Sequence, residues 1–327
     1  MSVELRKNTR YKLLRLTEEI DSLDAVREKI LERIYKTLLP LKNLPEDMED
    51  DEKYYYSRWN VETNNTESNS IYLHLNDKNC NEIPYLKVTA SCEYATRRRK
   101  DENNQILPKN HRLNIEQTDV VFVYKNEEVY AVVFTVEHQP LVRIKKLIGE
   151  DFISSEDNIN NLTSDFFHWL FYRYTMNKRD LGNYINLENI VGFTGIIMTD
   201  DHIVKGISDQ TAELIVTKAF ISNGYPIKSI KVKLYSGNGM LTFFVNENDD
   251  LYVESGSSIS LSISKCKEDI AMPIFLFFIV LPELRRLYTI DEQAFIGEEK
   301  LKFNAEMGKE VIRSIASKNA IDLNSLI

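Results

Sequence analysis

Cysteine is scarce in this sequence, and its scarcity excludes several classes of protein. The 327 residues contain three cysteines, Cys80, Cys92 and Cys266, which lie far apart and form no Cys-x-x-Cys pair. Zinc ribbons and thioredoxin-like redox sites need such pairs, so we expect neither. An odd number of widely spaced cysteines implies no disulfide framework, which is typical of a reducing compartment. We therefore expect a soluble, cytoplasmic protein.

Long apolar runs and signal-like segments are also missing. The most apolar stretch, Ile270 to Leu281, is too short to span a membrane and contains Pro273. Residues 1–30 are charged and periodic, unlike a secretory signal. We expect no membrane association and interpret the apolar stretch as a buried core segment.

The sequence has no excess of basic residues. It has 41 Lys and Arg against 50 Asp and Glu, which gives a formal net charge of −9. This balance argues against a surface that is basic throughout, although it is compatible with a local basic groove for nucleic acid. The hydrophobic share of 43% is ample for a packed core, and the length suits one large domain or two of ordinary size.

Several well-known catalytic motifs are absent. The chain has no Gly-rich loop followed by Lys-Ser or Lys-Thr, no Gly-x-Ser-x-Gly and no His-Glu-x-x-His. The glycines at Ser236-Gly237-Asn238-Gly239 are typical of a hairpin turn rather than of a phosphate-binding loop. These absences disfavour P-loop nucleotide hydrolysis, serine hydrolysis of the α/β type and zincin-type proteolysis.

The residue pattern predicts a mixed α/β (α+β) fold. It comprises an N-terminal helical segment, a central mixed sheet with flanking helices, and a C-terminal strand meander plus helices. We divide the chain into residues 1–43, residues 54–189 as an α/β domain with a candidate acidic site, and residues 190–327 as a second α/β region. The last two regions are either separate or one continuous domain.

Residues 5–39 have the spacing of a helix or a helical hairpin. Apolar residues recur there at steps of three and four, and Asp21-Ser22-Leu23-Asp24 is suited to cap a second helix. Pro40 would end the segment. The helix would serve either self-association and binding of a protein partner or packing on its own domain.

The later secondary structure follows from runs and caps. A capping box at Ser154 to Asp157 predicts an amphipathic helix, and Ser208 or Asp209 is suited to cap another that ends near Gly224. The apolar runs predict a buried strand at 190–198 and meander strands at 227–235, 240–245, 251–254 and 259–263. We expect a helix from residue 266 that is broken at Pro273 and Pro282, and a last helix at about 304–317.

Four aromatic residues form a cluster between the acidic segment at 44–53 and the polar loop at 60–70. They are Tyr54, Tyr55, Tyr56 and Trp59. Exposed aromatic rings can stack on nucleic-acid bases. Buried rings would instead anchor this segment on the core. The sequence leaves both interpretations open.

The most informative stretch is Thr118 to Gln139. Two apolar runs flank the polar turn Lys125 to Glu128, with Asp119 at the start of the first run and Glu137 at the end of the second. Residues 129–136 are apolar on both faces, which predicts a covered central strand. A three-residue loop would place Asp119 and Glu137 as diagonal neighbours on one face, whereas two or four residues would place them on opposite faces.

This arrangement resembles the PD-(D/E)xK nuclease core found in restriction enzymes and prokaryotic defence proteins. Asp119, Glu137 and Gln139 match its positions, with Thr118 in place of Pro and Gln139 in place of Lys. The resemblance implies that Asp119 and Glu137 hold Mg²⁺ and that Gln139 orients the attacking water. Its implied activity is metal-dependent phosphodiester hydrolysis, and a catalytically inactive nuclease fold is a further alternative.

Basic residues near this stretch are candidates for contacts with a nucleic-acid backbone. They are Arg97, Arg98, Arg99, Lys100, Arg143 and Lys145. An ordinary solvated loop explains the first four equally well. The leading hypothesis is thus a metal-dependent, nuclease-like hydrolase of antiviral defence, and the alternative is a non-catalytic interaction or assembly subunit of a larger complex.

Overall fold

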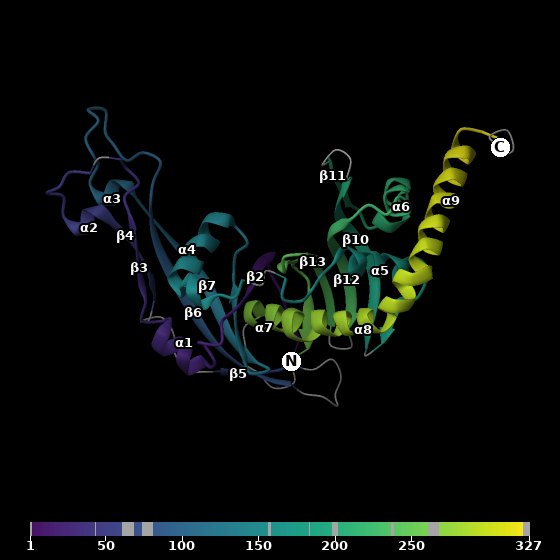
Figure 1. Cartoon of the computed structure of the whole chain (residues 1–327), viewed down its shortest axis with the longest axis horizontal. Helices are drawn as coiled ribbons and strands as arrows, with labels where there is room; N and C mark the ends of the chain where they lie inside the picture. Colours follow the sequence, from purple (N-terminus) through teal and green to yellow (C-terminus); the bar gives the residue numbers. More distant parts are fainter. Residues whose placement is uncertain are drawn as a thin grey trace. The chain divides into compact units, whose positions relative to one another are not determined.

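The structure is a computed structural model that describes residues 2–42, 44–60, 69–73, 81–155, 158–182, 184–197, 202–236, 239–260 and 268–322. The chain is an α+β protein with two compact units (Figure 1). Unit 1 comprises Met1–Thr9, Tyr72–Asn81 and Asn158–Ile327, and unit 2 comprises Arg10–Ile71 and Glu82–Asp157. The predicted division near residue 189 stays a prediction. Among the described residues, no helix is long and apolar enough to cross a membrane.

Unit 2 is built on a sheet with the strand order β2-β8-β7-β6-β4-β3, and β5 also pairs with β6. Every pair with a described register is antiparallel, so the predicted mixed sheet is antiparallel wherever its pairing is known. The strands are β2 (Thr9–Arg15), β3 (Ile34–Leu38), β4 (Tyr54–Trp59), β5 (Asn69–Leu73), β6 (Asn81–Ala95), β7 (Leu113–Lys125) and β8 (Glu128–Val133).

One face of this sheet forms the core of unit 2. Alternate residues of β6, including Leu86, Val88 and Ala90, point to it because successive strand side chains point to opposite faces. Helices α1 (Leu23–Lys29) and α4 (His138–Ile148) pack their apolar residues into the same cluster. Figure 1 shows α4 lying along β6 and β7. The side chains between these core positions therefore lie on the opposite face of the sheet.

The predicted helix over residues 5–39 is wrong for most of its length. Residues Tyr11 to Leu14 are consecutively buried in β2, which means that this strand is covered on both faces. The three- and four-residue spacing arose across a strand, a short helix and a second strand, and belongs to no single element. The predicted second cap is confirmed, because the Ser22 hydroxyl accepts from the Ala25 amide at 3.1 Å at the start of α1.

Unit 1 contains the predicted meander. Its strand order is β11-β10-β12-β13-β14, with β9 beside β10 and a separate β1-β15 pair, and every described pair is antiparallel. The strands are β1 (Ser2–Glu4), β9 (Asp180–Gly182), β10 (Ile185–Ile197), β11 (His202–Ile207), β12 (Ile227–Ser236), β13 (Gly239–Asn246), β14 (Asp250–Val253) and β15 (Ser258–Ser260). The predicted strands at 190–198, 227–235, 240–245 and 251–254 are confirmed, and the last predicted strand extends beyond the described residues.

Two of the predicted helix caps are wrong. The helix α5 (Ser164–Thr175) begins after Thr163, whose hydroxyl accepts from the Phe166 amide, and not after Ser154. The helix α6 (Ile215–Ser222) begins after Leu214, because the short 3-10 turn Thr211–Glu213 intervenes. The Ser208 hydroxyl accepts from the Gln210 amide in the preceding turn, because side-chain oxygens that are suited to cap a helix are equally suited to stabilise turns.

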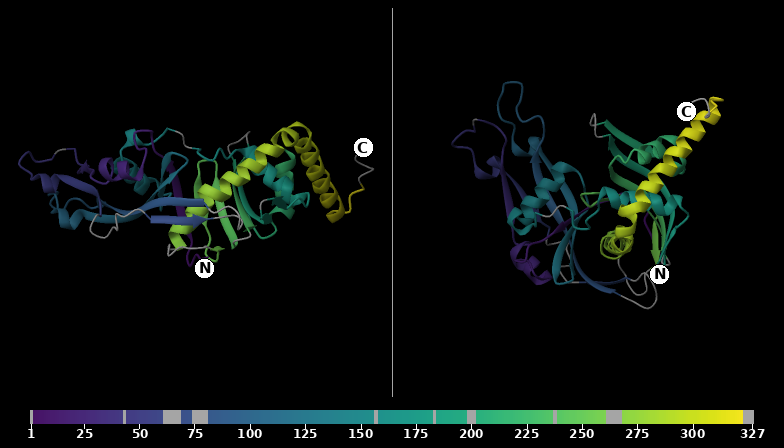
Figure 2. Two further views of the ribbon diagram at one scale, coloured as in Figure 1. Left: turned by 90° about the horizontal axis from the view of Figure 1, so that it is seen from below. Right: turned by 45° about the vertical axis from the view of Figure 1, so that its right-hand side comes forward.

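The C-terminal helices form one uninterrupted run. It passes from α7 (Glu268–Phe275) through π-helical residues Leu276–Val280 into α8 (Leu281–Ala294), then through Phe295–Glu299 into α9 (Lys300–Lys318). The predicted breaks at Pro273 and Pro282 are therefore wrong, while the predicted last helix is confirmed and is longer than expected. Figure 2 shows that the run bends between α8 and α9, where the π-helical residues lie.

Candidate functional site

The loop between β7 and β8 has two residues. Lys125 pairs with Glu128, and the intervening Asn126 and Glu127 both have positive φ, at 53° and 66°. This register places Val120 opposite Val133, and β8 ends there instead of continuing to Val136. The three-residue loop that would put Asp119 and Glu137 on one face therefore does not form.

The two acids have different environments. The Asp119 carboxylate lies 2.7 Å from the Lys87 ammonium and accepts from the Thr89 hydroxyl, also at 2.7 Å. Glu137 is the exposed N-cap residue of α4, and Gln139 lies exposed in the first turn of that helix. The structure thus gives Asp119 a lysine partner and places Glu137 and Gln139 on a helix.

A magnesium site needs several oxygen ligands that converge on one point. The described residues contain no group of three or more His, Cys, Asp or Glu side chains with that geometry. Asp119 is already neutralised by Lys87, so these residues do not fit the metal ion that the nuclease resemblance implies. The assignment of Mg²⁺ to Asp119 and Glu137 stays a prediction.

The predicted phosphate contacts are divided between a loop and a helix. Arg97 and Arg98 are exposed after β6, whereas Arg99 donates to the carbonyl oxygens of Thr96 and Pro40, and Lys100 donates to Asn104. These contacts hold the loop in a fixed conformation.

Two further predicted contacts lie on α4. Arg143 donates to Glu116 at 2.6 Å and lies over the Tyr94 ring at 3.9 Å, and Lys145 is half-buried. Glu116 and Tyr94 lie on the helix-covered face, so Arg143 is occupied there.

The opposite face of the unit 2 sheet carries an exposed surface, which we call the open face. Strand registers place its side chains in rows that cross β3, β4, β6 and β7, and Lys36, Tyr56, Glu93 and Ile115 form the central row. Ile34, Leu38 and Ile115 are exposed by 62%, 49% and 59%. The open face is defined by Ile34, Lys36, Leu38, Tyr54, Tyr56, Arg58, Ser91, Glu93, Ile115 and Gln117.

A pocket of about 930 Å³ lies on the open face. The sheet forms its floor, and helices α2 (Asp50–Lys53) and α3 (Lys109–Arg112) form its wall. This volume lies in the range of small-molecule and peptide side-chain sites. The lining residues are Ile34, Lys36, Asp51, Glu52, Tyr56, Arg58, Glu93, Pro108, Lys109, Asn110 and Leu113.

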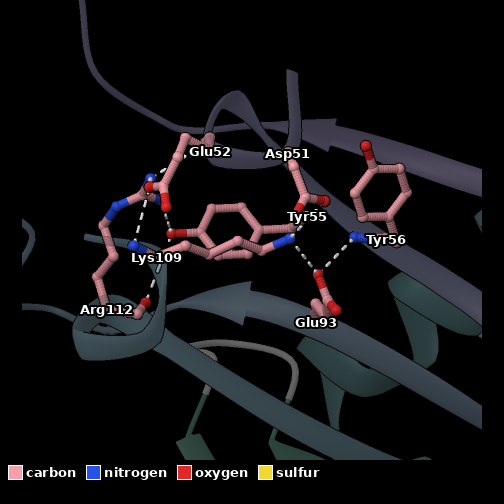
Figure 3. Close-up of polar contacts among 7 residues, drawn as sticks. All are labelled: Asp51, Glu52, Tyr55, Tyr56, Glu93, Lys109 and Arg112. Atoms are coloured by element: carbon pink, nitrogen blue, oxygen red, sulfur yellow. Dashed lines mark hydrogen bonds and ion pairs between the residues drawn. The ribbon is translucent and has the colours of Figure 1, made fainter. Parts of the chain in front are cut away.

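Lys109 joins the wall of the pocket to its floor (Figure 3). Its ammonium lies 2.8 Å from Glu93, 3.9 Å from Asp51 and 4.8 Å from the centre of the Tyr56 ring. Glu93 also accepts from the Tyr56 amide at 3.1 Å. Most of the positive charge of Lys109 is therefore neutralised within the pocket.

Arg112 holds the wall from behind and is fully buried. Its guanidinium donates to the Glu52 carboxylate at 2.8 Å, the Glu52 carbonyl at 2.5 Å and the Tyr55 hydroxyl at 2.5 Å (Figure 3). It also donates to the Leu107 carbonyl at 2.7 Å. A buried guanidinium needs such complete pairing. The helices α2 and α3 are thus fixed to β4.

The aromatic cluster is divided between the two faces. Tyr55 and Trp59 are buried, so the predicted anchoring on the core is confirmed for them. Tyr54 and Tyr56 are half-buried on the open face, and the Lys36 ammonium lies 5.8 Å and 5.6 Å from their ring centres. The same four-residue cluster therefore serves both the core and the exposed surface.

Two cations, Lys36 and Arg58, lie at the β3 side of the pocket. Lys36 and Arg58 are exposed, and within the described part of the chain neither has a carboxylate partner. They are diagonal neighbours on β3 and β4, because Ile34 pairs with Arg58 and Lys36 pairs with Tyr56. The pocket thus has a positive edge at β3, whereas its carboxylates are engaged by Lys109 and Arg112.

Thiol chemistry is not expected beneath this site. Cys92 lies on the core face, where burial raises the pKa of its thiol and a hydrogen bond from Ser57 opposes the shift only in part. A buried, protonated thiol is a poor nucleophile. Cys92 is therefore a core residue.

The sequence alone does not reveal the pocket, because its residues come from five separated segments. Residues 34–38, Ile-Tyr-Lys-Thr-Leu, show none of the apolar–polar alternation that would have marked a half-exposed strand. A comparison with protein-family models and a comparison with curated protein sequences both find no significant match.

Proposed function

We propose that this chain is a non-catalytic interaction protein that binds a protein partner through the open face of unit 2. The observation that carries the proposal is the exposure of Ile34, Leu38 and Ile115 on one sheet face beside a rigid pocket. Exposed apolar and aromatic side chains interspersed with charged ones are typical of protein–protein contacts. The partner is either another protein or a second copy of this chain.

The pairing inside the pocket supports binding rather than catalysis. Lys109 and Arg112 have fixed carboxylate partners, and such pairs hold a surface in one conformation before binding. A catalytic group would instead need a free acid or base beside a substrate. Asp119, the predicted catalytic residue that lies on the same sheet face, is engaged by Lys87.

Photo-crosslinking tests the proposal. Benzoyl-phenylalanine in place of Ile115 is expected to give a covalent adduct with a protein, and the same residue in place of Ile203 on β11 serves as the control. The partner is then purified, and its affinity for the wild type is compared with that for Ile115→Glu. A loss of at least about tenfold is expected, because the substitution places a charge in the contact.

Two results contradict the proposal. One is the absence of adducts at Ile115, or adducts with nucleic acid alone. The other is magnesium-dependent cleavage of DNA or RNA by the purified chain that is lost in Asp119→Ala and Glu137→Ala, which would establish the nuclease instead.

A further inference from the structure

We infer that β3 is a docking edge, to which an extended segment of the partner adds as a further strand, with an acidic side chain opposite Lys36 between two apolar ones. This inference rests on the proposed function and identifies the partner's chemistry. It concerns the edge of the open face, whereas the proposed function concerns the face as a whole.

The position of β3 in the sheet supports strand addition. It is the last strand of the unit 2 order and pairs with β4 along its full length, from Ile34 opposite Arg58 to Leu38 opposite Tyr54. No strand among the described residues pairs with its second edge. Backbone groups along such an edge are available to an incoming strand, which is how several peptide-binding domains recognise their ligands.

The side chains of β3 define the pattern that the added strand needs. Ile34, Lys36 and Leu38 alternate onto the open face and are exposed, whereas Tyr35 faces the other way, with Lys146 of α4 over its ring. Residues directly opposite in neighbouring strands contact one another, and pairs of like character or opposite charge stabilise the sheet. The incoming strand should therefore present apolar, acidic and apolar side chains at alternate positions.

The positive charge beside β3 determines which side chain of the partner lies opposite Lys36. Lys36 and Arg58 carry unneutralised charge beside this edge, while the acids of the pocket are engaged by Lys109 and Arg112. A lysine in the middle of an edge strand disfavours pairing with ordinary or basic strands. An acidic residue opposite Lys36 removes that penalty and forms an ion pair with it. Because the surrounding surface is already held in one conformation, Lys36 favours acidic strands over neutral or basic ones.

The test uses a fluorescein-labelled peptide, Thr-Val-Thr-Glu-Thr-Val-Thr, and the full-length chain. We expect anisotropy to show binding, and at least about tenfold weaker binding when the central Glu is replaced by Lys. Two further peptides carry N-methyl groups at alternate backbone nitrogens, one at the odd and one at the even positions. Only one of them should lose binding, because the nitrogens that point toward β3 lie at alternate positions of the added strand. Binding should also slow amide hydrogen exchange at Ile34 to Leu38.

Charge reversal is the matched genetic test. Lys36→Glu should reverse the preference, so that the Lys peptide binds better than the Glu peptide. Lys318→Glu, at an exposed lysine in the last turn of α9 in unit 1, should leave the preference unchanged. Three results would each overturn strand addition. The first is equal binding of the parent peptide and both methylated peptides, and the second is no effect of Lys36→Glu. The third is displacement of the peptide by a single-stranded oligonucleotide that binds through Lys36 and Arg58.

The failures of the two proposals are distinguishable. A partner confirmed through Ile115 together with a peptide that does not bind would remove strand addition and leave the interaction function standing. A peptide that binds through β3 together with no partner at Ile115 would instead remove the wider interface.

Discussion

The Lys87 ammonium lies 2.7 Å from the Asp119 carboxylate, so the acid that most resembles a metal ligand is already paired with a cation. We predict that Asp119→Asn lowers the free energy of unfolding by about 0.5–1 kcal/mol, because it removes a half-exposed ion pair and keeps the contact with Thr89. Urea denaturation measures this change. Saturating MgCl₂ should shift the Tm of the wild type and of the variant equally.

A larger magnesium-dependent Tm increase in the wild type than in Asp119→Asn would contradict this prediction and support a metal site. Glu137→Gln provides the matched control, because this exposed N-cap side chain makes no cap hydrogen bond in α4. Its effect on stability should lie within about 0.5 kcal/mol.

The hairpin turn provides a second prediction. Glu127 has a φ of 66°, a left-handed conformation that disfavours every residue except Gly and, to a lesser degree, Asn or Asp. Glu127→Gly should raise the free energy of unfolding by about 0.5–1 kcal/mol, measured by chemical denaturation. Glu28→Gly is the matched control, since this exposed position lies inside α1, where the same substitution should destabilise by about 1 kcal/mol.

The same turn shows why the candidate acidic site could not be predicted from sequence. Two-residue turns of this kind favour Asn-Gly, and Asn126-Glu127 provides only the first half of that signal. A one-residue difference in the loop reverses the face of every later side chain. The strands on both sides were predictable from their apolar runs, whereas the register that decides the chemistry was not.

The N-terminal segment shows a different limit. Leu13, Leu16 and Ile20 have helical spacing, but they occupy a strand and the chain that follows it. Burial on both faces removes the polar alternation that would have identified β2. By contrast, the meander of unit 1 was predictable because Gly, Asn and Asp separate its strands.

The pocket depends on contacts that sequence reasoning cannot pair. Glu52 is far from Arg112 in the chain, and Glu93 is far from Lys109. Each pair meets only once β4, β6 and the two short helices are in place. Within the acidic segment at 44–53, nothing in the sequence marks Glu52 as the partner of a buried arginine.

Arg112 supports a third prediction. Arg112→Lys should lower the free energy of unfolding by about 3 kcal/mol, because one ammonium cannot replace the planar group that contacts Glu52, Tyr55 and Leu107. Hydrogen exchange should show faster exchange in α2 and α3. Arg98→Lys, on the exposed loop, should change stability by less than about 0.5 kcal/mol. Equal effects of the two substitutions would contradict the role of Arg112 in fixing the pocket wall.

His168 provides the last prediction, which concerns pH and unit 1. Its ring is buried in α5, and burial lowers its pKa to about 4. The Tyr225 carbonyl, 2.9 Å from Nε2, opposes that shift, Lys300 adds to it and Asp165 opposes it. In the unfolded chain the pKa returns to about 6.5. Between these two values the unfolded state binds more protons than the folded state, so stability falls as the pH decreases.

The free energy of unfolding should therefore decrease by about 1.4 kcal/mol per pH unit below about pH 6.5 through His168 alone. Urea denaturation at about pH 7 and at about pH 5 measures this change. Between these pH values the free energy of unfolding should fall by about 2 kcal/mol more in the wild type than in His168→Gln. The variant retains a side-chain amide that can donate to Tyr225 but carries no titratable ring. An equal slope in the wild type and in His168→Gln would show that the His168 ring is protonated or solvated in the folded state.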